Sequence, residues 1–215
     1  MLGFEWKKYL ILKEERPELF INNGIINIVF DETIVENYQS QHGVNIGVVY
    51  DSPYNMMVVD LVYNDKEDYY TYERVIPKVQ NGAVVIIPKY NGKYVLLKQY
   101  RHAIRDYQYA FPRGFAEAGI SAEDNVRKEL FEEIGAKTSN IRYLGNVIAD
   151  SGLMGNKVSV YECELNEYIK KEKNEGIVEV IEVTSRQLID MIDSNELDDG
   201  FTLSAIAMQL SKWVL

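Results

Sequence analysis

Residues 114–136 read GFAEAGISAEDNVRKELFEEIGA, a glycine-containing loop followed by the clearest helix pattern in the chain. Apolar side chains recur at every fourth position over residues 122–134, and this spacing predicts a helix with one buried stripe. Ser121 can cap the start of the helix, and Gly135 stands where a left-handed C-terminal cap belongs. The stretch therefore predicts a loop and a helix whose two ends are fixed by the local sequence.

Three glutamates of this helix, Glu129, Glu132 and Glu133, are spaced so that their side chains project from one narrow arc. Their mutual repulsion costs about 0.2–0.5 kcal/mol per pair, and a bound cation would reverse the sign of this interaction. Mg²⁺ prefers oxygen ligands and is commonly held by a few carboxylates together with substrate phosphates. Glutamates are also common on solvated helix faces, so the helix alone leaves open both a metal site and an ordinary exposed surface.

The whole stretch resembles the Nudix box, G-x5-E-x7-R-E-U-x-E-E-x-G-U, in which U is a bulky aliphatic residue. Ile120 replaces the first Glu of this pattern, Lys128 replaces its Arg, and Ala136 replaces the last aliphatic residue. Either the changes at Ile120 and Lys128 compensate each other, or the box is degenerate and the protein binds ligands without hydrolysing them. Catalysis is favoured because the glutamates are intact. The matching positions are Gly114, Glu129, Leu130, Glu132, Glu133 and Gly135.

The order of the expected elements, which is strands, helix, strands, helix and helix, is typical of a mixed sheet between helices. Residues 83–87 and 94–97 flank Asn91-Gly92, and this pair predicts a tight hairpin. The fold class is α+β, and the resemblance implies the Nudix fold, a mixed β-sheet sandwiched between helices (α/β/α). The remaining elements expected are strands at residues 141–148, 158–165 and 177–183, a helix that begins at Thr184 with a capping box, and a helix from about Thr202 to the C-terminus.

The first part of the chain has a different composition, with short β-branched and aromatic runs such as residues 24–30 and 56–63. These runs predict short antiparallel strands, with no helix beyond a possible turn near residues 6–12. We therefore expect an N-terminal antiparallel β subdomain at residues 1–78 and a Nudix hydrolase domain at residues 79–215. The resemblance implies that the N-terminal subdomain pairs two copies of the chain into a homodimer.

Composition excludes several classes of protein. The 215 residues carry a formal net charge of -10, which disfavours binding to nucleic acid. Cys163 is the only cysteine, so an intramolecular disulfide is impossible, and this fits a reducing compartment. The N-terminus does not read as a secretory signal, and the purest apolar run, residues 83–87, is too short to cross a membrane. We expect a cytoplasmic protein without a membrane or nucleic-acid partner.

Residues 95–101 and 109–114, VLLKQYR and YAFPRG, resemble the ADP-ribose pyrophosphatase branch of the Nudix hydrolases. This resemblance implies Mg²⁺-dependent hydrolysis of the pyrophosphate bond of ADP-ribose or a similar nucleoside diphosphate sugar, which gives AMP and a sugar phosphate. Two alternatives stay open. One is a hydrolase for another nucleoside diphosphate derivative, such as a dinucleotide or another nucleotide sugar. The other is a Nudix-fold ligand sensor without turnover.

The resemblance also assigns roles to individual residues. It implies that the backbone carbonyl of Arg113 holds Mg²⁺, or Mn²⁺ as a substitute, together with the three helix glutamates. Arg101 is expected to contact the substrate, although a surface ion pair is equally open, and Arg74 is a weaker match to a second contact. Gly114 is the third expected substrate-binding residue, because a glycine permits a close approach of the backbone. Glu175 is the best match to the general base; alternatives are Glu172, Glu179 and a merely solvated Glu175.

Overall fold

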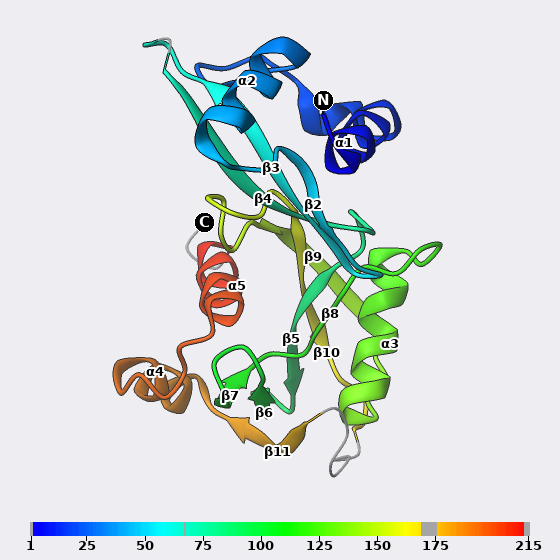
Figure 1. Ribbon diagram of the computed structural model, residues 1–215. Coiled ribbons are helices and arrows are strands. Elements are labelled where there is room, and N and C mark those ends of the chain that lie inside the picture. Colours follow the sequence, from blue (N-terminus) through cyan, green and yellow to red (C-terminus); the bar gives the residue numbers. More distant parts are fainter. Residues whose placement is uncertain (1, 67, 169–175, 213–215) are drawn as a thin grey trace. The chain divides into compact units, whose positions relative to one another are not determined.

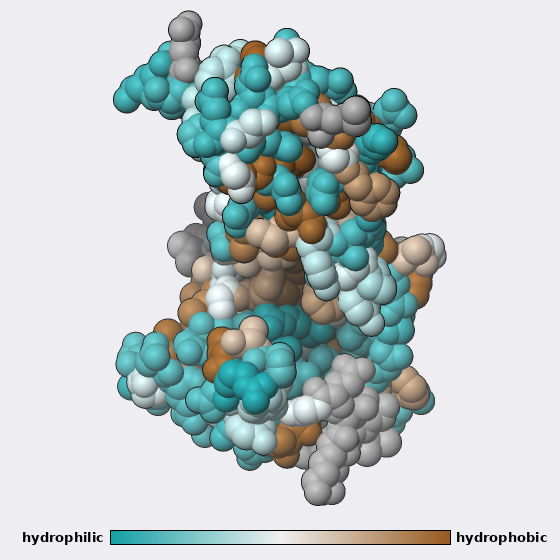
Figure 2. All heavy atoms as spheres, viewed as in Figure 1, coloured by the Kyte–Doolittle hydropathy of each residue, from teal (hydrophilic) through white to brown (hydrophobic). Residues whose placement is uncertain are grey.

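A computed structural model describes residues 2–66, 68–168 and 176–212 (Figure 1). The chain divides into two compact units. The first unit comprises residues 1–78 with 150–156, and the second unit comprises residues 79–149 with 157–215. Figure 2 shows hydrophilic residues over much of the visible face, with hydrophobic residues scattered among them. No helix within the described ranges is both long enough and apolar enough to cross a membrane.

The first unit contains an antiparallel sheet, in which the central strand β3 pairs with all three of the others. The prediction of a strand at residues 56–63 is confirmed, whereas only two residues of the run 24–30 form a strand. The elements are α1 (Phe4–Glu15), the 3-10 helix η1 (Pro17–Phe20), β1 (Asn27–Ile28), α2 (Glu32–His42), β2 (Gly47–Asp51), β3 (Asn55–Tyr63) and β4 (Tyr69–Pro77).

The prediction of a nearly helix-free N-terminus is wrong, because α1 and α2 are both well-formed helices of the first unit. α1 buries Trp6, Tyr9 and Leu12, which are spaced three residues apart, so a narrow stripe packs it onto the sheet. Asp31 caps the start of α2, where its side chain accepts from two backbone N–H groups, and Gly43 caps the end of the helix with a φ of 66°. These caps start and stop a helix whose own sequence is polar and partly β-branched.

The second unit is built on a mixed sheet with the strand order β11-β6-β5-β10-β9. β10 runs parallel to β5, and the other ladders are antiparallel. β7 pairs with β6, and β8 pairs with β5. The predicted strands at residues 141–148, 158–165 and 177–183 are confirmed to within one residue at each end. The two predicted hairpin strands, residues 83–87 and 94–97, are also present, but they end three and four residues later than expected. The described sheet has seven strands. They are β5 (Val84–Tyr90), β6 (Lys93–Arg101), β7 (Asp106–Ala110), β8 (Arg113–Gly114), β9 (Asn140–Val147), β10 (Val158–Glu164) and β11 (Ile177–Val183).

Helices cover both faces of this sheet, as Figure 1 shows. α3 (Ala122–Ile134) packs on one face, where Leu130 lies in a cluster with Val84 and Ile86. α4 (Ser185–Asp193) and α5 (Gly200–Ser211) pack on the other face, against a cluster that contains Val85 and Ile87. Successive residues of a strand point to opposite faces, so β5 contributes side chains to the cores on both faces of the sheet. The α+β fold class and the α/β/α arrangement are confirmed.

The hairpin and the helix caps of the second unit agree with the local sequence. Asn91 and Gly92 have φ values of 50° and 76°, as a two-residue turn with positive φ at both positions requires. Thr184 makes the predicted capping box at the start of α4. α5 begins at Gly200, two residues before the expected start, because Asp199 accepts from the backbone N–H of Thr202 and caps the helix.

The left-handed end of α3 allows a test of stability. Gly135 has a φ of 64°, and its N–H donates to the last carbonyls of the helix. Gly135→Ala is expected to lower the free energy of unfolding by about 1–2 kcal/mol, because a Cβ is disfavoured in this conformation. Urea denaturation measures the change. Gly200→Ala is the matched control, since Gly200 has no positive φ and open space around its Cβ position. Equal stability of the two variants would contradict the prediction.

Candidate active site

The loop before α3 lies directly against the acidic face of the helix. β8 pairs with the start of β5, with Gly114 opposite Val84 and Arg113 opposite Val85. A Cβ built on Gly114 would lie 2.1 Å from Oε1 of Glu129 and 2.2 Å from its Cδ. Gly114 has no positive φ, so the glycine is needed here for close approach and not for an unusual backbone conformation. The carboxylate of Glu129 therefore rests on the backbone of β8.

The three glutamates do not share one environment. Glu129 and Glu133, one turn apart, are buried, with exposed fractions of 8% and 3%. The side chain of Glu132 is half-exposed, and its Oε2 accepts from Nζ of Lys128 at 2.7 Å. Within the described ranges, no three His, Cys, Asp or Glu side chains gather closely enough to hold a metal ion. The structure thus brings together two carboxylates and the β8 backbone, and it pairs the third carboxylate with a lysine.

Lys128 is held by two acidic side chains. Its Nζ lies 2.8 Å from Oε1 of Glu117 as well as 2.7 Å from Glu132, and it lies 3.9 Å from Glu129. The hydrogen bonds that Lys128 donates to Glu117 and Glu132 raise the pKa of Lys128. Ile120 stands where the family has its first Glu, and Glu117 replaces that Glu as an acidic partner of Lys128. Sequence reasoning missed Glu117 because it lies three residues before the family's position, although it is the only acidic residue between Gly114 and Ser121.

We expect this substitute ion pair to be weak. Glu117→Gln should lower the free energy of unfolding by less than about 1 kcal/mol, because both side chains are well exposed to solvent. Urea denaturation at low and high salt measures the loss, which should shrink with salt. Glu123→Gln is the matched control, because Glu123 is another exposed glutamate of the second unit and its ion-pair partner, Arg127, is 3.9 Å away. A salt-independent loss of several kcal/mol would contradict a solvent-screened pair.

Two arginines lie near the buried carboxylates. Burial lowers the pKa of the Arg101 guanidinium, the charge of Arg113 lowers it further, and the charges of Asp199 and Glu133 act in the opposite direction. Arg101 is therefore within electrostatic reach of all three groups. Its Nε is buried and makes no hydrogen bond to any residue that the structure describes. Within the described residues, Arg101 makes no ion pair, so the surface ion pair that the sequence left open for it is not observed.

Arg113 belongs to a hydrogen-bonded network that sequence reasoning missed. Its guanidinium donates to Oδ1 of Asp199 at 2.9 Å, and Oδ2 of Asp199 accepts from the backbone N–H and the hydroxyl of Thr202. The hydroxyl of Thr202 in turn accepts from the N–H of Phe111 at 2.9 Å. This network fixes the loop before Gly114 to the N-terminus of α5. The available signal was the spacing of Asp199 to Thr202, which is that of an N-cap.

A buried asparagine fixes the other end of the loop. The Asn125 side chain is fully buried on α3, and its Nδ2 donates to the carbonyls of Gly82 and Phe115, both at 2.8 Å. Because Phe115 follows Gly114 directly, these bonds restrain the backbone on which Glu129 rests. The loop is therefore fixed from α5 on one side and from α3 on the other.

The other predicted site residues lie elsewhere. Arg74 belongs to the first unit, where its guanidinium pairs with the buried carboxylate of Asp60 and donates to the carbonyl of Leu19 at 2.8 Å. These contacts support a role for Arg74 in the core of that unit, and its predicted contact with substrate is untested. Glu179 accepts from the Tyr109 hydroxyl on the second unit. Glu172 and Glu175 fall outside the described residues.

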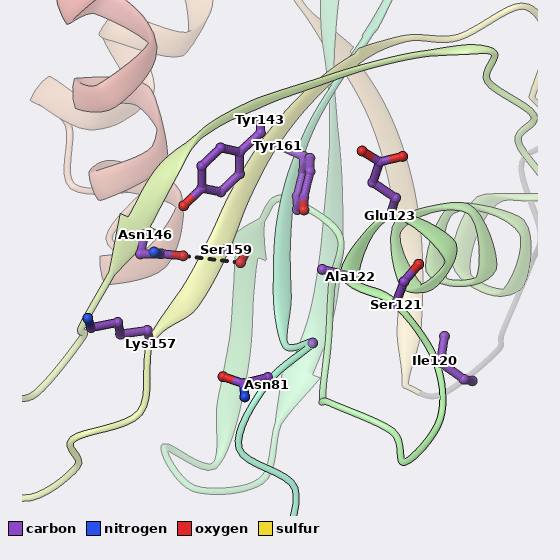
Figure 3. A pocket seen from close by; sticks show the side chains of 11 residues that line it. Asn81, Ile120, Ser121, Ala122, Glu123, Tyr143, Asn146, Lys157, Ser159 and Tyr161 are labelled. Carbon is purple, nitrogen blue, oxygen red and sulfur yellow. Dashed lines mark hydrogen bonds between the residues drawn. The ribbon is translucent and has the colours of Figure 1, made fainter. Parts of the chain in front are cut away.

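A separate hollow of about 610 Å³ lies at the N-terminal end of α3, between this helix and the strands β9 and β10 (Figure 3). Its lining includes Ser121 and Glu123 from the start of α3, together with Tyr143, Tyr161 and Lys157. The rings of Tyr143 and Tyr161 are 5.4 Å apart. The lining does not include the paired glutamates or the arginines described above, so the chemistry is assigned to the carboxylates beside β8.

Comparisons with known proteins identify the family to which this chain belongs. The model of the NUDIX domain matches residues 79–200, which is more than half of the chain. The chain therefore belongs to the NUDIX domain family, and the predicted membership of the Nudix hydrolases is confirmed.

Two curated relatives and one solved structure describe the similarity. The ADP-ribose pyrophosphatase of Bacillus subtilis is 26% identical over 154 residues, which is 69% of this chain and 83% of the relative. The NAD-capped RNA hydrolase NudC of Mannheimia succiniciproducens is 34% identical over 87 residues, or 39% of this chain and 30% of that protein. The chain thus matches less than a third of NudC. A crystal structure of an ADP compounds hydrolase has a TM-score of 0.66 at 18% identity and covers 80% of this chain and 92% of its own.

Proposed function

We propose that this protein hydrolyses the pyrophosphate bond of ADP-ribose or a similar nucleoside diphosphate sugar in a Mg²⁺-dependent reaction, giving AMP and a sugar phosphate. The observation that carries the proposal is the contact of the buried Glu129 carboxylate with Gly114, beside Glu133 and the guanidinium of Arg101. Acidic oxygens suit a hard cation, and guanidinium groups suit the diphosphate that this cation would bridge. The names of the relatives, ADP-ribose pyrophosphatase and ADP compounds hydrolase, support the same substrate class.

The residues at the site fit Mg²⁺ with a limited set of protein ligands. Glu129 and Glu133 offer buried carboxylate oxygens on one face of α3, and the carbonyl of Arg113 belongs to the strand on which Glu129 rests. Mg²⁺ commonly takes one or two carboxylates and completes its coordination with water and substrate phosphates. When bound, such an ion neutralises the diphosphate and acidifies an attacking water. We propose these three residues as ligands, with Mn²⁺ as a substitute and with Glu132 as a further ligand only if it leaves Lys128.

The other proposed site residues have supporting roles. Arg101 would bind and orient the diphosphate, since its guanidinium makes no ion pair within the described part of the chain. Gly114 keeps space for the Glu129 carboxylate beside the loop. Glu175 stays the proposed general base, and Arg74 stays a proposed substrate contact.

A second substrate class is favoured by other relatives. A GDP-mannose pyrophosphatase of Escherichia coli is 24% identical over 83% of this chain, and an NAD-capped RNA hydrolase is 34% identical over 39% of it. These names support another nucleoside diphosphate derivative, such as a different nucleotide sugar or a dinucleotide, as the alternative substrate. The diphosphate is shared by all these compounds, so the same carboxylates and arginines would serve.

A substrate panel tests the proposal. The purified protein is offered ADP-ribose, GDP-mannose, NAD and diadenosine compounds, with MgCl₂ or with EDTA, and the released mononucleotide is measured by chromatography. We expect ADP-ribose to give AMP and ribose phosphate at the highest kcat/KM, and only with the metal. A faster reaction with another compound would identify the alternative substrate. Binding of ADP-ribose without any product would identify a ligand sensor and would refute the enzymatic proposal.

We further propose that residues 1–78 form a dimerisation subdomain beside a Nudix hydrolase domain at residues 79–215, and that the working form is a homodimer in the cytoplasm without a nucleic-acid partner. The net charge of -10 and the single, buried Cys163 support the last two points. Light scattering of the full chain measures the mass of the particle. A monomer at micromolar concentration would refute the dimer and leave the proposed reaction untouched.

A further inference from the structure

The side chain of Arg113 is oriented by the fold in a way that its backbone role does not require. Its guanidinium donates from Nη1 to Asp199 and lies 5.2 Å from the ring centre of Phe201. A guanidinium has five N–H donors, and within the described residues the side chain of Arg113 makes only this one hydrogen bond. A quarter of the side chain, 25%, is exposed. Most of the donors of Arg113 are therefore available to a ligand.

Asp199 is rigidly held where it meets Arg113. Only 6% of its side chain is exposed, and its second oxygen accepts two bonds from Thr202, at 2.9 Å from the backbone N–H and 2.7 Å from the hydroxyl. The guanidinium also makes a cation–π contact with the ring of Phe201. Arg113 thus has a fixed position, which lowers the entropy lost when it binds a ligand.

A second guanidinium, that of Arg101, lies within electrostatic reach of Arg113. The charges of Arg113, Asp199 and Glu133 all act on it, and its buried Nε makes no bond within the described residues. Two like charges in a partly buried place repel each other more than they would in water. One carboxylate, Asp199, pairs directly with one of these two cations. A ligand with two adjacent negative groups would relieve the repulsion and match the planar donors of both arginines.

We infer that the side chains of Arg113 and Arg101 together bind the diphosphate of the substrate, and that Asp199 is a positioning residue that holds Arg113 for this contact. The inference rests on the proposed function and deepens it, because it assigns the anion-binding groups of the same site. It also separates two roles of Arg113, since a side-chain variant keeps the backbone carbonyl proposed as a metal ligand. The competing explanation is that Arg113 and Asp199 form an ion pair that only stabilises the fold.

The first experiment measures binding of the methylene-bridged analogue of ADP-ribose by calorimetry in MgCl₂. Arg113→Ala is expected to weaken binding by roughly 10-fold to 100-fold, as expected when hydrogen bonds to a charged group are lost. Arg113→Lys should restore only part of the affinity, because lysine lacks the planar fork. Arg142→Ala is the matched control, since it removes an exposed guanidinium on β9 and should change nothing. Unchanged affinity in Arg113→Ala, or no binding by the natural protein, would overturn the inference.

The second experiment tests the positioning role by a double-variant cycle. Asp199→Asn keeps a side chain that can cap α5 but removes the charge that holds Arg113. We expect roughly 3-fold to 10-fold weaker binding in the natural background and no further loss in the Arg113→Ala background, because Asp199 would act only through Arg113. Equal losses in both backgrounds, which a merely structural role would give, would overturn the positioning role.

Failure of this inference is distinguishable from failure of the proposed function. A protein that hydrolyses ADP-ribose equally well with and without the Arg113 side chain refutes the inference alone. A protein that binds the analogue through Arg113 but hydrolyses nothing on the substrate panel refutes the proposed function and leaves the anion-binding arginines in place.

Discussion

Glu133→Gln is expected to reduce kcat/KM by roughly 100-fold to 10,000-fold, the largest loss that we predict for a single conservative change. Glu133 is 3% exposed on α3, and glutamine has nearly the same shape, so the packing of the helix should be retained. What is lost is the negative charge that would attract a divalent cation. A metal ion contributes several kcal/mol of charge stabilisation to such reactions, and each 1.36 kcal/mol is a factor of ten in rate.

The measurement is a pair of titrations with substrate and with MgCl₂, together with a thermal denaturation curve. Glu123→Gln is the matched control, because Glu123 is an exposed residue of the same helix and has no role at the site. Denaturation midpoints close to that of the natural protein would show that the fold is retained. Full activity in Glu133→Gln would contradict the metal assignment.

Glu132→Gln tests whether Glu132 acts together with Glu129 and Glu133 or stays paired with Lys128. The sequence pattern treats all three glutamates alike, whereas the structure pairs Glu132 with Lys128. If Glu132 keeps this partner during turnover, its replacement should cost less than about tenfold, because no charge is removed from the metal. A loss as large as that in Glu133→Gln would show that Glu132 leaves Lys128 and joins the other two carboxylates.

The Nudix unit was largely predictable because its signals are local. α3 has an N-cap, an apolar stripe and a left-handed glycine within 15 residues, and the observed helix has the predicted ends. The hairpin of β5 and β6 follows from two residues, Asn91 and Gly92, that tolerate positive φ. Where a few neighbouring residues determine the backbone, the pattern and the structure agree.

The first unit was less predictable because its helices depend on tertiary contacts. α1 carries charged residues on most of its surface, and only packing against the sheet makes a helix of it. α2 contains the β-branched residues Thr33, Ile34 and Val35, which favour strands when considered alone. The local signals of this helix are its caps, Asp31 and Gly43, and sequence reasoning missed both.

The site residues also differ in whether local sequence or tertiary contacts determine their positions. Gly114, Glu129 and Glu133 follow from the spacing of one motif, and the structure brings them together. Asp199 lies 86 residues from Arg113, so nothing in the local pattern of either residue reveals their ion pair. Lys128 finds Glu117 only because the loop folds back on the helix. Contacts between distant segments depend on the fold and cannot be obtained from motif spacing.

The contact between the loop and α3 gives the second large prediction. Gly114→Ala is expected to lower kcat/KM by roughly 100-fold, because the new Cβ would lie 2.1–2.4 Å from three atoms of the Glu129 side chain. Such contacts are impossible, and Glu129 is too buried to move without disturbing its neighbours. Displacing a catalytic group by about 1 Å can cost a factor of 100 in rate, and overpacking costs about 1–3 kcal/mol of stability.

Two further variants determine whether the loss comes from Glu129. Gly24→Ala is the control for the substitution itself, since Gly24 has no positive φ and no atom within 4 Å of its Cβ position. In Gly114→Ala combined with Glu129→Ala, the clash is removed, so the free energy of unfolding should recover relative to Gly114→Ala while turnover stays low. Recovery of both would show that Glu129 is dispensable for the reaction and that Gly114 serves packing alone. Recovery of stability without turnover is the expected result, because the carboxylate, and not the space that it fills, is what the metal requires.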